Sequence, residues 1–315
     1  MPGRGSVAEA ESTIVVAAGQ RSDGGAVRPL LRASGGSASG DGSARISGRL
    51  RERPADANHD AGLVVFGGDG AGSFGGEIFG AGGTMSVPAI DVRGLRYTYP
   101  DGTPALRGVD FQLAAGESVA LLGANGSGKT TFLLHMAGLL RGDGEIRIGG
   151  VALEEETLSA IRRSVGYVFQ DSDDQLFMPT VLEDVAFGPL HRGVDGVESI
   201  RRARETLATL GISHLEDRAP YHLSAGEKKR ASLAGVLVMN PDVLIFDEPT
   251  TFLDPPGQNE LARLLMELPQ AKLIATHDVY FARKVAGRAV FFAAGRIAGD
   301  GAVEVIADRF HWRLS

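Results

Sequence analysis

Gly123–Thr131 reads Gly-Ala-Asn-Gly-Ser-Gly-Lys-Thr-Thr, a glycine-rich stretch that ends in a lysine and two threonines. It matches the pattern G-x-x-x-x-G-K-[ST] of a phosphate-binding loop. Glu117–Leu122 before it is a short apolar run suited to a buried strand, and Phe132–Leu140 after it continues as an apolar helix. Three glycines let the backbone curl so that its N–H groups point inward, where they can hold phosphate oxygens. A glycine-rich turn with a chance lysine is the alternative, but strand, loop and helix in register favour a nucleoside triphosphate site.

Two side chains of the loop have predicted roles of their own. Lys129 is placed to reach the β- and γ-phosphates, and the Thr130 hydroxyl to ligate Mg²⁺. The helix that follows adds its positive N-terminal end to the anion site. The other candidate nucleotide-binding residues of the loop are Gly123, Asn125, Gly126, Ser127, Gly128 and Thr131.

The composition argues against several other classes of protein. A net charge of −7 and a pI near 5.6 oppose a nucleic-acid binder, because such binding rests on clustered positive charge. The 315 residues contain no cysteine, which excludes disulfides, zinc–thiolate sites and thiol catalysis. No apolar run approaches the roughly 18 residues that a membrane-spanning helix needs. Any membrane association is therefore expected to come through a partner.

The composition changes sharply near Met85. Residues 1–84 hold nearly half of the 44 glycines, together with many Ser, Ala, Arg and Asp residues. Such a segment buries too little apolar surface to offset the entropy lost on ordering. We expect residues 1–84 to be disordered, or to be an artefact of start-site assignment in a protein that naturally begins at Met85; a regulatory tail is the alternative. Residues 85–315 are the predicted folded domain.

From Met85 onward, strand-like and helix-like stretches alternate. The predicted strands are Ala89–Tyr99, Val109–Leu113, Glu117–Leu122, Glu145–Ile148, Val165–Phe169, Val243–Glu248 and Lys272–Ala275. The predicted helices are Thr180–Pro189 and Val197–Leu210. The second has an apolar face with Val197, Ile200, Leu207 and Leu210, and its arginines and glutamates lie on other faces. This alternation predicts an α/β domain with a mainly parallel central sheet and flanking helices.

Val243–Glu248 reads Val-Leu-Ile-Phe-Asp-Glu, four apolar residues followed by two acids. The apolar run suits a central strand buried on both faces, and its end is where such a strand meets a ligand crevice. Asp247 is predicted to hold Mg²⁺, and Glu248 to polarise an attacking water as general base. An ordinary solvated turn is the alternative, which the nearby phosphate loop disfavours.

Leu223–Arg230 reads Leu-Ser-Ala-Gly-Glu-Lys-Lys-Arg and opens a helix whose apolar body is Ala231–Met239. Ser224 and Glu227 form a predicted capping box. The serine side chain caps the helix, and the glutamate side chain, three residues later, accepts a bond from the serine backbone N–H. The cap does not explain Gly226, because glycine weakens a helix. A glycine there keeps the helix N-terminus bare, so an anion could approach its N–H groups. We expect this helix to bind phosphate on another subunit, since the first site has its own loop.

At these motifs the chain from about Ala89 onward resembles the ATP-binding subunit of ABC transporters. Gly123–Thr130 matches Walker A, Val243–Glu248 matches Walker B, and Leu223–Glu227 is similar to the signature sequence. Other residues occupy positions that are characteristic of the family. Tyr99 corresponds to the aromatic residue that stacks on adenine, and Gln170 to the glutamine of the Q-loop. Leu253-Asp254 matches the D-loop, and His277 matches the switch histidine. Taken singly, each of these residues also has a purely structural alternative. Tyr99 could close a turn, Gln170 could end a strand, and His277 could lie at the start of a helix. Ala225 departs from the usual glycine of the signature.

The resemblance implies a P-loop ATPase fold with a mainly parallel central sheet, an antiparallel β subdomain and a helical subdomain. It implies ATP and Mg²⁺ as ligands, with Thr130, Gln170 and Asp247 at the metal. Glu248 is the implied catalytic base, assisted by Lys129, Gln170 and His277, while Ser224 and Gly226 complete the site in trans and Asp254 lies nearby. The implied function is ATP hydrolysis that drives a transport partner.

The resemblance also implies partners and a place in the cell. The partners are a second ATP-binding subunit (a copy or a paralogue), a transmembrane coupling subunit and a substrate-binding membrane subunit, but no nucleic acid. The chain is then peripheral, on the cytoplasmic face of the cell membrane. Three stretches are similar to the energy-coupling-factor branch: Gln170–Phe177 (Gln-Asp-Ser-Asp-Asp-Gln-Leu-Phe), Leu223–Arg230 and Ala234–Pro255. The cobalt or nickel uptake subgroup is the closest match. A translation- or DNA-repair-associated ABC ATPase is the alternative, disfavoured because Ser224 follows Lys129 by 95 residues without sustained heptads.

Overall fold

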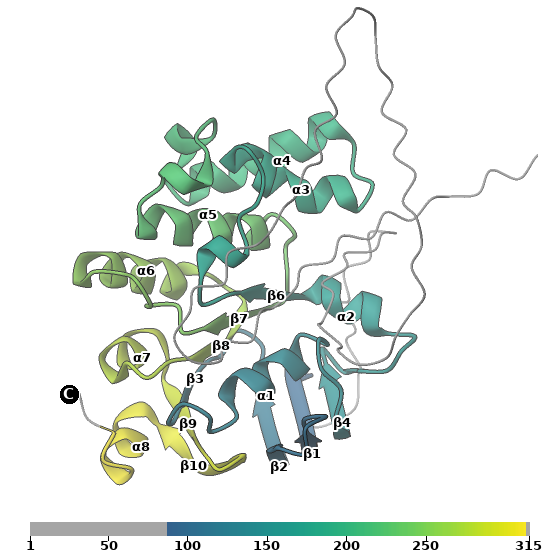
Figure 1. The fold of residues 1–315 in the computed structure, drawn as a ribbon, viewed down its shortest axis with the longest axis vertical. Coiled ribbons are helices and arrows are strands. Elements are labelled where there is room, and N and C mark those ends of the chain that lie inside the picture. Colours follow the sequence, from purple (N-terminus) through teal and green to yellow (C-terminus); the bar gives the residue numbers. More distant parts are fainter. Residues whose placement is uncertain (1–86, 313–315) are drawn as a thin grey trace, which may run out of the picture. The chain divides into compact units, whose positions relative to one another are not determined.

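The computed structural model describes residues 87–312, and the predictions for residues 1–84 lie outside this range. Within it, the chain forms two sheets with helices around them (Figure 1). The α/β architecture that the alternating sequence pattern predicted is confirmed.

The larger sheet has six strands in the order β10-β9-β3-β8-β7-β6. From β9 to β6 all neighbouring strands are parallel, whereas β10 pairs antiparallel with β9. Their bounds are β3 (Ser118–Leu122), β6 (Val165–Val168), β7 (Val243–Asp247), β8 (Ala271–Ala275), β9 (Arg288–Ala293) and β10 (Arg296–Ala302). Every residue of β7 and β8 is buried, as expected for central strands covered on both faces. The predicted mainly parallel sheet is confirmed.

The smaller sheet has four strands in the order β2-β1-β4-β5, and every pair is antiparallel. Their bounds are β1 (Ile90–Thr98), β2 (Pro104–Leu113), β4 (Asp143–Ile148) and β5 (Val151–Ala152). Helix α1 (Lys129–Met136) follows the phosphate loop. Its Phe132, Leu133 and Met136 share one core cluster with side chains from both sheets. The antiparallel subdomain implied by the resemblance is present, and α1 anchors the phosphate loop to both sheets.

Helices α3, α4 and α5 pack on one another and form the helical subdomain (Figure 1). The remaining bounds are α2 (Leu158–Ser164), α3 (Val181–His191), α4 (Gly196–Thr209), α5 (Ala225–Leu237), α6 (Pro255–Glu267), α7 (Val279–Val285) and α8 (Val303–Arg309). No helix within residues 87–312 is both long and apolar enough to cross a membrane.

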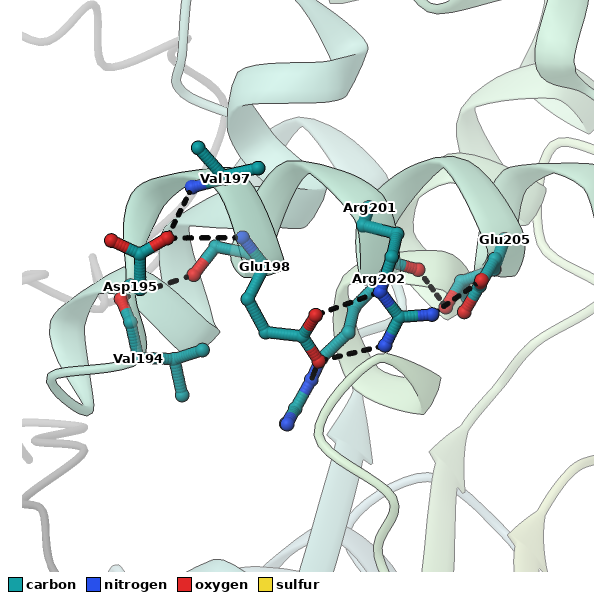
Figure 2. A network of polar contacts seen from close by, with 9 residues as sticks. Val194, Asp195, Val197, Glu198, Arg201, Arg202 and Glu205 are labelled. Carbon is teal, nitrogen blue, oxygen red and sulfur yellow. Dashed lines mark hydrogen bonds and ion pairs between the residues drawn. The ribbon is translucent and has the colours of Figure 1, made fainter.

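Helix α4 begins with a side-chain cap and carries a row of ion pairs on its exposed surface (Figure 2). The Asp195 carboxylate accepts a hydrogen bond from the backbone N–H of Val197 at 2.9 Å. Arg201 contacts Glu198 at 2.7 Å and Glu205 at 2.5 Å. Such exposed pairs within one helix contribute little stability individually, so burial of the opposite face holds α4 in place.

The buried face of α4 consists of Ser199, Ala203 and Leu207, whereas Val197 is 82% exposed. The prediction that Val197 belongs to the apolar face is wrong. Val197 lies two residues before Ser199, about 200° around the helix, and therefore points away from the core.

Helix α1 is shorter than the apolar run Phe132–Leu140 predicted, because it ends at Met136. Two residues later, Gly138 adopts a left-handed φ of 65°. A Cβ atom at Gly138 would also lie 2.7 Å from Cδ1 of Leu158 in α2. The chain thus turns at a position whose left-handed backbone favours glycine, before the apolar stretch is complete.

Candidate nucleotide site

The phosphate loop connects β3 to α1 and depends on two close backbone approaches. Gly123 has φ 139°, and a Cβ atom there would lie 2.3 Å from the carbonyl oxygen of Phe292. Gly128, directly before α1, has φ 108°, and its Cβ would lie 2.8 Å from the carbonyl oxygen of Ala105. Because Gly128 has no side chain to cap α1, the first N–H groups of this helix are available to an anion.

Lys129 is buried, and its ammonium group lies within the loop. The Nζ atom donates hydrogen bonds to the carbonyl oxygens of Gly123 at 2.7 Å and Ala124 at 3.3 Å. Burial lowers the pKa of Lys129, while the negative charges of Glu248 and Asp247 oppose this change. The two acids therefore favour the charged amine, whose carbonyl partners a phosphate group can replace.

Two hydroxyl groups of the loop region have contrasting surroundings. Ser127 Oγ is buried and has no hydrogen-bond partner among the residues described here. A buried unpaired hydroxyl is costly, and a phosphate oxygen would satisfy it. Thr131 Oγ1 instead lies 2.8 Å from the Tyr99 hydroxyl, which ties the predicted adenine-stacking residue to the first turn of α1.

Asp247 ends the central strand β7 and faces the loop. Its carboxylate accepts hydrogen bonds from the Thr130 hydroxyl at 3.2 Å and from the Tyr167 hydroxyl at 3.2 Å. Burial raises the pKa of Asp247, the two hydrogen bonds oppose this rise, and the charge of Glu248 adds to it. The pKa of Tyr167 is raised in turn, first by burial and then by the neighbouring Asp247 charge. The carboxylate is thus held by neutral donors at a position where a cation would be favourable.

Glu248 follows β7 with a left-handed φ of 44°, which is uncommon for a residue other than glycine. Its Oε2 atom lies 2.8 Å from Nδ1 of His277 and accepts a bond from the His277 backbone N–H at 3.2 Å. An ionised carboxylate only accepts, so His277 Nδ1 is the donor in this pair. The His277 side chain is 65% exposed, whereas that of Glu248 is 11% exposed. The pair therefore combines a sheltered carboxylate with an imidazole open to the cleft.

A cleft of about 500 Å³ opens over the loop. Its lining includes ten of the predicted site residues: Tyr99, Asn125, Gly126, Gly128, Lys129, Thr130, Thr131, Gln170, Glu248 and His277. Gly123 and Asp247 lie directly behind this lining, bonded to Lys129 and Thr130. The fold thus collects residues from five separate stretches of sequence around one cavity.

Three predicted site residues do not line this cleft as the structure describes it within residues 87–312: Ser224, Gly226 and Asp254. Ser224 and Glu227 form the predicted capping box at the start of α5, with the Ser224 N–H 2.8 Å from Glu227 Oε2. A Cβ atom on Gly226 would have no neighbour within 4 Å, so the helix N-terminus is open at this position. The Asp254 carboxylate caps α6 by accepting from the Gly257 N–H at 2.9 Å.

Tyr167 is a site residue that the sequence did not reveal. In the sheet, Tyr167 pairs with Ile245, and the two-residue period of a strand puts Asp247 on the same face as Ile245. The contact follows from the register between β6 and β7, which neither strand's sequence encodes alone. Thr103, Pro104, Ala105 and Thr251 line the cleft and were also not predicted as site residues.

The oxygen atoms near the loop suit Mg²⁺. Thr130, Gln170 and Asp247 offer hydroxyl, amide and carboxylate oxygens, and Thr130 and Asp247 already touch each other. Among residues 87–312, no group of three or more His, Cys, Asp and Glu residues is arranged to hold a metal ion. A magnesium ion here would take further ligands from phosphate and water, as this ion commonly does.

A glycine loop at a helix N-terminus, a buried lysine and an acid pair at the end of a central parallel strand define a P-loop ATPase. Residues 106–251 match the family model described as ABC transporter. The energy-coupling factor transporter ATP-binding protein EcfA of Methanothermobacter thermautotrophicus is 45% identical over 226 residues, which cover 70% of this chain and 73% of that protein.

Two solved structures share the fold. Clostridium perfringens cbiO1, part of the ABC transporter complex cbiONQ, has a TM-score of 0.65 at 38% identity and covers 70% of this chain and 92% of its own. The ATP-binding cassette MJ0796, a dimer in a post-hydrolysis state with ADP and Pi, has a TM-score of 0.61 at 28% identity, with coverages of 68% and 98%. The chain belongs to the family of ABC transporter ATP-binding proteins, and it is an ATP-hydrolysing subunit of such a transporter.

Proposed function

We propose that this chain powers an energy-coupling-factor uptake transporter for cobalt or nickel ions, from the cytoplasmic face of the membrane. The cleft that brings Lys129, Glu248 and His277 together carries the proposal, because it supplies what phosphoryl transfer requires. The likeness to EcfA and to cbiO1 supports the transporter type. The choice of cobalt or nickel rests on the resemblance of the sequence as a whole, including Gln170–Phe177, Leu223–Arg230 and Ala234–Pro255.

ATP binds in the cleft, with Tyr99 on the adenine ring and the loop N–H groups on the phosphates. Lys129 exchanges its bonds to Gly123 and Ala124 for bonds to the β- and γ-phosphates. Glu248 polarises the attacking water, and His277 stays oriented by its bond to Glu248. Magnesium held near Thr130, Gln170 and Asp247 would neutralise phosphate charge.

The site is completed by a second ATP-binding subunit, either a copy of this chain or a paralogue. Ser224 and the bare N-terminus of α5 at Gly226 contact the γ-phosphate held by the partner, and Asp254 lies at the same interface. The dimeric structure of MJ0796 supports this arrangement. Closure on ATP and release after hydrolysis move the transmembrane coupling subunit and the substrate-binding membrane subunit.

Replacement of the proposed base tests the function. Glu248→Gln is expected to bind ATP normally and to lose hydrolysis by roughly a hundredfold or more, because an amide cannot take up the proton. The measurement uses the complex of this chain with its membrane subunits in vesicles, and follows phosphate release together with uptake of labelled cobalt or nickel. Uptake should need ATP and should vanish in Glu248→Gln.

Three outcomes would contradict different parts of the proposal: the catalytic base, the transported ion or the role in transport. Hydrolysis at the wild-type rate in Glu248→Gln removes Glu248 as the base. A complex that hydrolyses ATP but imports neither ion has another cargo. Copurification with ribosomes or DNA, rather than with a membrane protein of several spans, argues against transport altogether.

A further inference from the structure

His135 is a buried imidazole in α1 that the proposed ATP chemistry does not use. None of its surface is exposed, and its Nδ1 atom lies 2.7 Å from the carbonyl oxygen of Thr131, one turn earlier in the helix. A carbonyl oxygen only accepts, so Nδ1 carries the proton and donates. Burial lowers the pKa of His135, while the bond to Thr131 opposes this change. Burial therefore favours the neutral ring, which α1 holds in one orientation.

The second nitrogen of this ring has unfavourable surroundings. Nε2 of His135 is buried and has no hydrogen-bond partner among residues 87–312. A Cβ atom at Gly142 would lie 3.1 Å from Nε2, so the ring is closely covered on this side. Burial of an unpaired polar atom costs free energy, and leucine or phenylalanine would fill the space without this cost. A role of the ring in positioning other groups explains a histidine here better than packing alone.

The His135 ring is the inner end of a row of three aromatic rings. It meets Tyr97 edge to face, with ring centroids 4.8 Å apart and an angle of 73° between the planes. Tyr97 in turn meets Tyr99 edge to face at 5.1 Å and 80°. Both contacts have the geometry that attracts aromatic rings to each other. Since Tyr99 lines the nucleotide cleft, the row leads from the interior of α1 to the cleft.

Hydrogen bonds connect the two ends of the row by a second path. The Tyr99 hydroxyl lies 2.8 Å from Thr131 Oγ1, and the Thr131 carbonyl oxygen accepts the bond from His135. We call these residues, His135, Tyr97, Tyr99 and Thr131, the aromatic circuit. The circuit holds Tyr99 at its hydroxyl group through Thr131 and at its ring through Tyr97.

We propose that His135 positions Tyr99 for stacking on the base of the bound nucleotide, so that affinity for the base depends on this buried ring. The inference rests on the proposed function, in which Tyr99 stacks on adenine. A ring that is already oriented loses less freedom when the base binds, which strengthens binding. His135 is a positioning residue, because it does not line the cleft as described within residues 87–312 and acts through Tyr97 and Thr131.

Comparison of two ligands separates the base from the phosphates. ATP carries both, whereas inorganic triphosphate can occupy the phosphate loop but has no base. His135→Leu keeps apolar volume but loses the ring and the donor. It should weaken ATP binding by roughly fivefold and change the affinity for triphosphate by less than about twofold, as expected for loss of an aromatic contact. Titration calorimetry on the full chain measures both affinities.

Two further variants show whether His135 acts through Tyr99. His135→Phe keeps a ring beside Tyr97 and should hold the affinity for ATP within about twofold of wild type. Tyr99→Ala should lower the ratio of ATP affinity to triphosphate affinity by itself. Addition of His135→Leu to Tyr99→Ala should then cause no further loss of ATP affinity, because no stacking ring remains to be positioned.

Phe132 offers a matched control in the same helix. It is equally buried, but its ring contacts Phe111 and Phe292. Phe132→Leu should lower thermal stability and leave the ratio of the two affinities at the wild-type value. Tyr97→Leu, at a partly buried position, removes the middle ring of the row and decides the question if His135→Leu does not fold.

A wild-type ratio in both His135→Leu and Tyr97→Leu, with a lowered ratio in Tyr99→Ala, overturns the inference and leaves the proposed function intact. An equal loss of ATP and triphosphate affinity in His135→Leu also overturns it, because the ring then supports the phosphate loop. An unchanged ratio in Tyr99→Ala instead contradicts the stacking role of Tyr99 in the proposed function, and the inference falls with it.

Discussion

At the scale of single residues, two adjacent acids serve two different partners. Successive side chains of a strand point to opposite faces, yet Asp247 contacts Thr130 while Glu248 reaches His277 beside the same cleft. The left-handed backbone of Glu248 makes this possible, because β7 ends at Asp247 and the chain turns immediately. Strain at such a position is a common feature of functional sites.

Asp184 in α3 makes stability depend on pH. Its carboxylate accepts from the N–H groups of Phe177 at 3.1 Å and Met178 at 3.0 Å, and burial raises its pKa from 3.8 to about 6. Between these values the folded state binds more protons than the unfolded state, so the Asp184 contribution to stability falls as the pH rises through this window.

Comparison with Asp184→Asn isolates this effect from those of the other acids. The melting temperature of wild type minus that of the variant should fall as the pH rises from about 4 to about 7 and then level off. Thermal unfolding in a pH series measures it. A difference that stays constant over this range shows that Asp184 keeps an ordinary pKa.

At the scale of elements, the sequence predicted what local patterns encode. Apolar runs located β3, β7 and β8, and the capping box located the start of α5. The predicted bounds were wrong where contacts with another element determine them. Helix α1 ends early, before Gly138, which lies close to Leu158 of α2. Strand β2 begins before the predicted strand because its first residues pair with β1. The contact between Tyr99 and Thr131 was equally out of reach, since it joins segments 32 residues apart.

The cap of α5 has a structural role and a proposed functional role, which one substitution can separate. Ser224→Ala should cost about 1 kcal/mol of stability through loss of the cap, and should also weaken dimerisation driven by ATP. Thr180→Ala is the control, because Thr180 and Glu183 form the same capping box at α3. Both stability and dimerisation are measured, by denaturant unfolding and by light scattering with ATP. Equal dimerisation in the two variants contradicts the role of Ser224 at the partner's phosphate.

At the scale of the whole molecule, we propose that residues 85–315 contain everything that ATP hydrolysis requires. The cleft, both sheets and the helical subdomain lie within residues 87–312. A chain that begins at Met85 should therefore unfold at the same temperature as the full chain and hydrolyse ATP at the same rate. Lower thermal stability or a slower rate in the shortened chain shows that residues 1–84 contribute to the fold.

The order of strands in the central sheet explains how the site is assembled. Strand β7, with the acids at its end, lies between β6 and β8, and β3, with the phosphate loop at its end, lies beside β8. Two segments that are 117 residues apart at Thr130 and Asp247 thus meet at the carboxyl ends of these parallel strands. The sequence motifs predicted the phosphate loop and the two acids separately, and the order of strands in the sheet brings them together.

We propose that each ATP site is shared between two subunits, and a mixture of two inactive variants gives a direct test. Ser224→Arg blocks the start of α5, and Lys129→Ala disables the phosphate loop. In a head-to-tail dimer of one of each, both lesions fall on the same site and the other site is whole. Differently tagged variants are produced together, and the mixed dimers are isolated before phosphate release is measured.

Mixed dimers should hydrolyse ATP, at no more than about half of the wild-type rate because one of the two sites remains, while each variant alone should be inactive. Mixed dimers that form but hydrolyse no more ATP than the separate variants would show that Ser224 is only a helix cap, and that the ATP site is not shared between subunits.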